Sequence, residues 1–313
     1  MPSTSNSPVQ QLRALANRPE EQARYAITLL RPRQARDLLQ AALAAVRRYP
    51  LLEARTPLLK LYAYFSEQPE KRDPGGYVRR PLLDALRPLA MPEDLPLFLA
   101  AVATYERYPP SFQEEAGLVR AAGLVALNEL DDRLACFHAA RLLADLMHTD
   151  DMSGEPAVTA IGVLAAHDEL MPLYLYATLP PSPDRSEVTA ECLRSLTDLP
   201  PALLEPLAAQ YADCEDSLVL IGLFDLLLGH QSGLQEEDFL TDLLARAREP
   251  DLYRYQTTAL VAAGERAPLD LLLASVRWET DRSRRAIARD ALVLRADEPR
   301  VIEALARLDQ MPE

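Results

Sequence analysis

The fold of this chain is decided by EEAGLVRAAGLVALNEL at residues 114–130, which is followed directly by DDRLACFHAARLLAD at residues 131–145. In the first stretch Leu118, Ala122 and Val125 recur at i, i+4 and i+7, the spacing of an apolar stripe along one face of a helix. A short acidic break separates this stretch from a second amphipathic stretch. Together the two predict a helical hairpin.

The same pattern recurs along the chain, for example where residues 76–90 are followed by residues 91–105. We predict seven helix pairs from Tyr77 onward, with first helices centred near Pro81, Ala122, Thr159, Ala190, Ile221, Gln256 and Ala286. Helix pairs repeated in tandem bury their apolar faces only by stacking on their neighbours. The sequence therefore predicts an all-α solenoid that forms one continuous body.

The first quarter of the chain lacks the regular spacing. Residues 1–8 are rich in Ser, Pro, Thr and Asn and are expected to be a disordered tail. Helices are predicted at Val9–Asn17, Pro19–Leu30, Pro32–Tyr49 and about Leu52–Glu67. Because QPEKRDPGG at residues 68–76 reads as a polar turn, we interpret residues 9–75 as an N-terminal helical capping region and residues 76–313 as the repeats, continuous with it in one solenoid.

Composition sets further limits. Hydrophobic residues make up 49% of the chain and charged residues 26%, as in folded globular proteins. The longest strongly apolar stretch, residues 218–228, contains Asp225 and is too short to cross a membrane. No secretory signal is recognisable, and the three cysteines form neither a CxxC pair nor a zinc spacing. We therefore expect a protein without a membrane segment in the reducing cytoplasm.

Charge is distributed unevenly around a net charge of −14. Residues 129–251 contain 24 Asp and Glu against six Arg and no Lys. Such a surface repels a phosphate backbone and attracts basic proteins or peptides, so we expect a protein or peptide partner and not a nucleic acid. The alternative interpretation is that the excess of carboxylates only maintains solubility.

Several segments combine features of one pattern: an acidic or Pro-containing entry, Val or Leu followed in some of them by Arg, and Ala and Leu at helical spacing. They are GYVRRPLLDAL, GLVRAAGLVAL, EPAVTAIGVLA, SEVTAECLRSL and DEPRVIEALARL. In this respect residues 76–308 resemble the HEAT-repeat proteins. The resemblance implies a right-handed α-α superhelix, and Arg79 and Arg120 match the family arginine, which Thr159 and Thr189 replace in later repeats.

Two groups of residues are candidates for binding. Tyr77, Arg79, Arg120, Asp225 and Tyr255 are expected to line a concave surface formed by the first helices. Asp225, within an apolar helix, is expected to point to a groove or to bind a neighbouring arginine. Of the two tyrosines at positions 253 and 255, one can lie in the core while the other is exposed, and core packing is the alternative interpretation.

The second group surrounds the only tryptophan, Trp278. Arg282, Arg285 and Arg289 lie at i, i+3 and i+7, so a helix would place them on one face that could bind an acidic peptide or a phosphate group. Glu279, Asp281 and Asp290 lie among them and could neutralise this face locally. A role within the fold is the alternative interpretation.

No catalytic motif, metal-ligand spacing or cofactor motif stands out. We therefore predict a non-enzymatic protein-protein interaction scaffold, without metal or cofactor, that holds a protein or peptide on its concave surface. Two alternatives stay open. One is an enzyme or enzyme subunit of the HEAT-like class, either a DNA-base glycosylase with Trp278 and Glu279 in its site or a protein similar to bilin lyases. The other is a structural subunit that stacks end to end on another protein.

Overall fold

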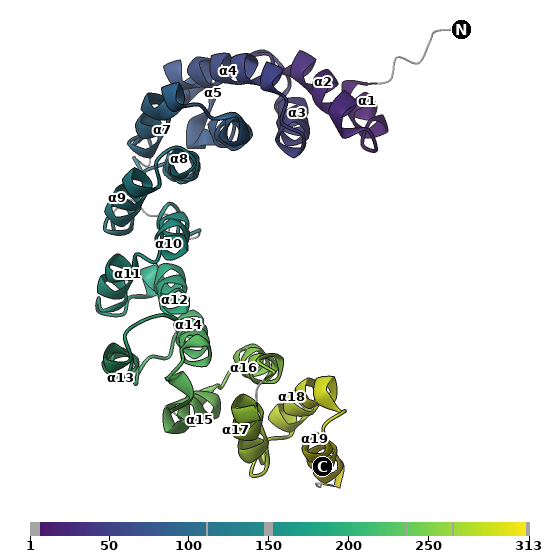
Figure 1. The fold of residues 1–313 in the computed structure, drawn as a ribbon, viewed down its shortest axis with the longest axis vertical. Coiled ribbons are helices and arrows are strands. Elements are labelled where there is room, and N and C mark those ends of the chain that lie inside the picture. The colour runs from purple at the N-terminus through teal and green to yellow at the C-terminus, as the bar shows by residue number, and fades with distance from the viewer. Residues whose placement is uncertain (1–6, 111, 147–152, 236, 265, 311–313) are drawn as a thin grey trace. The chain divides into compact units, whose positions relative to one another are not determined.

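A computed structural model gives the fold (Figure 1) and describes residues 7–110, 112–146, 153–235, 237–264 and 266–310. Over these residues every regular element is a helix, and the β-type pairing found is an isolated bridge between Arg107 and Glu114. The chain divides into two compact units, Met1–His167 and Asp168–Glu313. Most of the predicted tail lies outside the described residues, but Ser7 caps the first helix, which begins at Pro8.

The first unit consists of helices arranged in two rows. Its helices are α1 (Pro8–Ala14), α2 (Pro19–Leu29), α3 (Arg36–Arg48), α4 (Arg55–Glu67), α5 (Pro69–Arg72), α6 (Arg79–Leu86), α7 (Leu95–Val102), α8 (Gly117–Asn128), α9 (Asp132–Leu143) and α10 (Ala157–Ala166), with short 3-10 helices η1 (Leu52–Ala54), η2 (Pro74–Gly76), η3 (Arg87–Leu89) and η4 (Pro92–Asp94). One row is α3, α6, α8 and α10, each packed on the next, and α2, α4, α7 and α9 pack against it (Figure 1). Because α3 and α4 both pack on α6, the helices on either side of residues 68–76 belong to the same unit.

The second unit repeats this arrangement. Its helices are α11 (Leu170–Ala177), α12 (Ser186–Arg194), α13 (Pro201–Gln210), α14 (Ser217–Gly229), α15 (Glu237–Arg246), α16 (Pro250–Ala262), α17 (Arg266–Val276), α18 (Arg282–Leu292) and α19 (Pro299–Gln310), with η5 (Pro183–Arg185), η6 (Gly233–Gln235) and η7 (Val293–Arg295). In Figure 1 α12, α14, α16 and α18 follow one another in one row, and α11, α13, α15 and α17 form the other. Each helix of the first row packs on the next.

The predicted helix pairs are confirmed. The seven predicted centres lie within α6, α8, α10, α12, α14, α16 and α18, and a second helix follows each of them. Within each unit the helices of the first row pack on one another in series, and the buried side chains are mostly Leu and Ala. This serial packing confirms the predicted all-α solenoid class.

Helix α14 has the environment that its composition predicts. It packs between α12 and α16, and it buries Val219, Leu223 and Phe224 among other apolar side chains. Asp216 caps its first turn by accepting hydrogen bonds from the backbone N–H groups of Leu218 and Val219. A helix with apolar residues on nearly every side is stable in water only when it is covered from two sides.

One predicted helix start is wrong. The helix expected from Pro32 begins at Arg36, because residues 31–34 form a turn closed by a hydrogen bond from the N–H of Gln34 to the carbonyl of Arg31. Among the described residues, no helix has the length and apolar content that a membrane crossing requires.

Candidate functional site

Arg79, at the first position of α6, is a buried structural residue. Its side chain is 2% exposed and forms a two-pronged ion pair with Glu106, at 2.5 Å from Nη1 to Oε1 and 2.7 Å from Nη2 to Oε2. Its Nε also donates to Asp73 Oδ2 at 3.2 Å. Burial alone would lower the pKa of Arg79, but the hydrogen bonds and charges of Glu106 and Asp73 raise it above its usual value.

Arg120 occupies the corresponding place in α8 and is also buried. Its Nη2 lies 2.6 Å from Glu114 Oε2, its Nη1 donates to the carbonyl of Thr104 at 3.0 Å, and its guanidinium stacks 4.3 Å from the centre of the Tyr105 ring. Glu114, in turn, accepts from the backbone N–H groups of Glu106 and Ala116. The two arginines therefore hold the linker between α7 and α8, and the prediction that they line a binding surface is corrected.

Tyr77 precedes α6 and keeps its place as a surface candidate. Its side chain is exposed, and its ring lies over Gly75, where an added β-carbon would meet the ring at 2.6 Å. Gly75 has a φ of +77°, a conformation that glycine adopts without strain. The turn thus fixes Tyr77 in an exposed position in the first unit.

Asp225 and Tyr255, both predicted candidates, are in direct contact in the second unit. The hydroxyl of Tyr255 in α16 donates to the Asp225 carboxylate in α14, at 2.7 Å from Oδ1 and 2.8 Å from Oδ2. Arg194 at the end of α12 donates from Nε to Asp225 Oδ2 at 2.9 Å. As predicted, Asp225 binds a neighbouring arginine, and Tyr255 is at the surface while Tyr253 is buried.

The contacts among Arg194, Asp225 and Tyr255 join three successive first helices. At the other end of α12 the hydroxyl of Ser186 hydrogen-bonds to Asp216, which caps α14. Burial and the hydrogen bond to the Asp225 carboxylate raise the pKa of Tyr255 to about 12. The hydroxyl therefore keeps its proton near neutral pH and donates to the carboxylate.

We call the solvent-facing side of α12, α14 and α16 the ladder face. It consists of Glu187, Glu191 and Arg194 of α12, Leu218, Ile221, Asp225 and Leu228 of α14, and Asp251, Tyr255 and Thr258 of α16. Leu218 is 46% exposed although it is a large apolar side chain, and Ile221 and Leu228 are half-buried. Polar contacts thus hold together a surface whose middle is apolar.

The predicted arginine face at the C-terminal end is partly neutralised. Arg282, Arg285 and Arg289 all lie on α18, and Arg289 pairs with Asp309 of α19 at 2.9 Å. Trp278 is 77% exposed, in contact with Arg277. Glu279 is bound instead by Arg284, at 3.1 Å from Nε to Oε2.

Arg284, which the prediction left out of this face, is anchored by several contacts. Its guanidinium donates to the carbonyl groups of Leu244 and Ala245 and lies 4.2 Å from the centre of the Tyr253 ring. Its contacts extend from the end of α15 to α16 and hold α18 in place. The structure thus gives this part of the arginine cluster a role within the fold.

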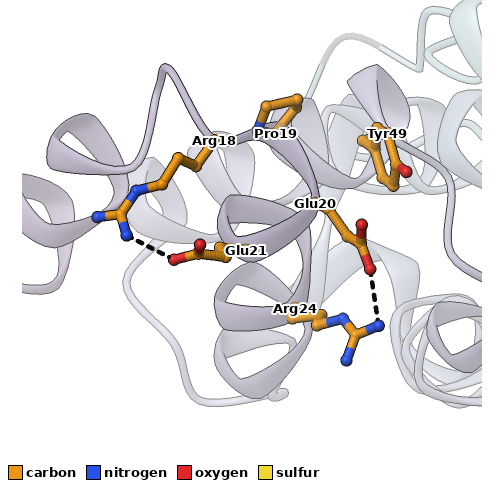
Figure 2. A pocket seen from close by; sticks show the side chains of 6 residues that line it. All are labelled: Arg18, Pro19, Glu20, Glu21, Arg24 and Tyr49. Atoms are coloured by element: carbon orange, nitrogen blue, oxygen red, sulfur yellow. Dashed lines mark hydrogen bonds and ion pairs between the residues drawn. The ribbon is translucent and has the colours of Figure 1, made fainter.

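An open cavity of about 520 Å³ lies at the start of α2. Figure 2 shows its lining and the two ion pairs that occupy it, Arg18 with Glu21 at 2.9 Å and Arg24 with Glu20 at 2.7 Å. Tyr49 forms the opposite wall. Because both guanidinium groups already have carboxylate partners on the same helix, this cavity presents no unpaired charge to a ligand.

A second cavity, about 470 Å³, lies between the segment before α14 and the segment before α16. It is lined by Cys214, Arg246, Arg248, Glu249 and other residues. Burial raises the pKa of the Cys214 thiol, so the thiol is not an activated nucleophile. No group of three or more His, Cys, Asp or Glu in the described part of the chain is placed to hold a metal ion.

Comparison with protein-family models, with curated proteins and with solved structures finds no match to this chain. The candidate site therefore depends on the geometry alone. Sequence reasoning found Asp225 and Tyr255 but missed Arg194, although Arg194, Asp225 and Tyr255 are separated by 31 and 30 residues, within the range of the repeat spacing. Glu106 and Glu114 were missed because they lie in an irregular linker.

Proposed function

We propose that this protein is a non-enzymatic scaffold that holds a protein or peptide partner on the first helices of its second unit. The observation that carries the proposal is the ladder face. There Arg194, Asp225 and Tyr255 join three helices into one surface, and Leu218 of the central helix remains exposed. Exposed apolar side chains next to an anchored tyrosine are typical of protein interfaces.

The charge of this part of the chain also supports a protein partner. The segment that carries the ladder face, residues 168–251, has 17 Asp and Glu against four Arg. A nucleic acid would be repelled by this charge, whereas a protein with basic groups would be attracted. Membership in the HEAT-repeat family stays a prediction, and an extended binding surface is a common property of stacked helical repeats.

The test is site-specific photo-crosslinking in the cells that naturally produce this protein. A benzophenone amino acid replaces Leu218 in one variant and Ile221 in a second. A third variant carries it at Leu175, an exposed leucine of α11 in the other row of helices. We expect a discrete protein adduct from the two ladder-face positions and none from Leu175. Adducts from Leu175 alone, or from none of the positions, would overturn the proposal.

A further inference from the structure

We infer that the segment that docks on the ladder face is a basic amphipathic helix. The inference rests on the proposed scaffold function and specifies the chemistry of its partner. It follows from an apolar line on α14, from carboxylates on both sides of that line, and from the way in which the charges already on this face are compensated.

The apolar line follows one side of α14. At 100° per residue Leu218, Ile221 and Leu228 fall within about 80° of one another around the helix axis. They extend over ten residues, or about 15 Å along the axis. Asp225 lies in the same line, but it is bound by Arg194 and Tyr255. The line can therefore be covered by apolar side chains without leaving a bare charge beneath them.

Carboxylates flank this line on both sides. On α12, Glu187 is exposed and has no ion-pair partner among the residues that the structure describes, and Glu191 shares Arg194 with Asp225. On α16, Asp251 pairs with Arg254, and both side chains are largely exposed. An exposed ion pair of this kind contributes little to stability, so it can be exchanged for a partner's cation.

The complement of an apolar line with acidic borders is a helix with one apolar stripe bordered by Lys or Arg. Such a helix places anchors at i, i+3, i+4 and i+7 and lays them on the apolar line. Its cations then meet the carboxylates of α12 and α16. Neither an anionic lipid surface nor a nucleic acid offers this combination, because both bring negative charge to an acidic face.

The test uses three synthetic peptides of about 18 residues, long enough to cover the apolar line. The first carries Leu at helical spacing and Lys elsewhere, the second is its scramble with the same composition, and the third has Glu in place of every Lys. Binding to the full chain is measured by fluorescence anisotropy at low and high salt. We expect the first peptide to bind at least about tenfold more tightly than its scramble, with salt weakening it, and the third not to bind.

Variants locate the binding. Leu218→Ser should weaken the first peptide about tenfold, and Glu187→Gln should weaken it less and reduce its salt dependence. The matched controls are Leu175→Ser on α11 and Glu205→Gln on α13, both exposed positions in the other row, and they should leave binding unchanged. Circular dichroism melting curves verify that all four variants are folded.

If the scrambled peptide binds as tightly as the first, or if the control variants lose as much affinity as the ladder-face variants, the binding is unspecific charge attraction. Either result would overturn the inference. So would tight binding of the Glu peptide. If the peptides fail while Leu218 and Ile221 still give a crosslinked adduct, the scaffold function stands and its partner has another chemistry. If crosslinking at these positions fails, the proposed function itself is overturned.

Discussion

Gly222 of α14 lies directly against the backbone of Ala190 in α12. A β-carbon on Gly222 would come within 2.4 Å of the Ala190 carbonyl oxygen and 2.6 Å of its Cα. Because backbone atoms cannot move aside as a flexible side chain can, the two helices would have to separate. The glycine is therefore what permits the close approach of α12 and α14 on which the ladder face depends.

We predict that Gly222→Ala destabilises the second unit by about 1–3 kcal/mol despite the better helix propensity of alanine. Urea unfolding followed by circular dichroism measures the change. The matched control is Gly162→Ala in α10, where an added β-carbon meets no atom within 4 Å. That variant should gain up to about 1 kcal/mol. A stabilising effect of Gly222→Ala would contradict the packing described.

The buried and exposed arginines should differ sharply in their contributions to stability. Arg79→Met leaves Glu106 and Asp73 buried without their cation, so we expect a loss of about 3–5 kcal/mol. Arg194 is 44% exposed, and Arg194→Met should cost no more than about 1 kcal/mol. Urea unfolding of the two variants makes the comparison. If Arg79→Met costs as little stability as Arg194→Met, the linker between α7 and α8 does not depend on its buried ion pairs.

Helix pairs were predictable from the sequence because a 3.6-residue apolar period marks each helix and Pro or acidic residues mark the breaks. The residues at which helices begin were less predictable. Pro19 is the first residue of α2, as the prediction has it, but Pro32 is the second residue of a four-residue turn that delays α3 to Arg36. Proline fits both positions with the same φ, so local sequence does not distinguish them.

The candidate site residues also differ in how far the sequence predicts their environment. Asp225 and Tyr255 were predictable as surface residues, and their partner Arg194 follows from the repeat spacing of 31 and 30 residues. Arg79 and Arg120 occupy positions where an arginine could equally face solvent. Their burial depends on Glu106 and Glu114, which an irregular linker brings to them. The repeat spacing gives no information about a partner residue that lies in a linker outside the repeated helices.

Alkaline pH should destabilise the first unit through Tyr62 of α4. Burial raises the pKa of Tyr62 to about 12, above the value of about 10 in an unfolded chain. As the pH rises, the unfolded chain therefore releases this proton first. The contribution of the protonated hydroxyl to the free energy of unfolding is complete below about pH 10 and is lost as the pH rises toward about 12. Urea midpoints across this range should fall less steeply for Tyr62→Phe than for the natural chain. Identical slopes would contradict the burial of this hydroxyl.

Gln256 of α16 should be a position where the natural residue lowers stability. Its side chain is 0% exposed, and neither its Oε1 nor its Nε2 has a hydrogen-bond partner among the described residues. A buried amide without partners costs about 1–3 kcal/mol, whereas methionine has a similar length and no such requirement. We therefore expect Gln256→Met to stabilise the second unit by about 1 kcal/mol or more in urea unfolding. The exposed Gln235→Met should change stability by less than about 0.5 kcal/mol. A loss of stability in Gln256→Met would mean that the amide is hydrogen-bonded in solution, and that its polarity contributes to the packing of α16.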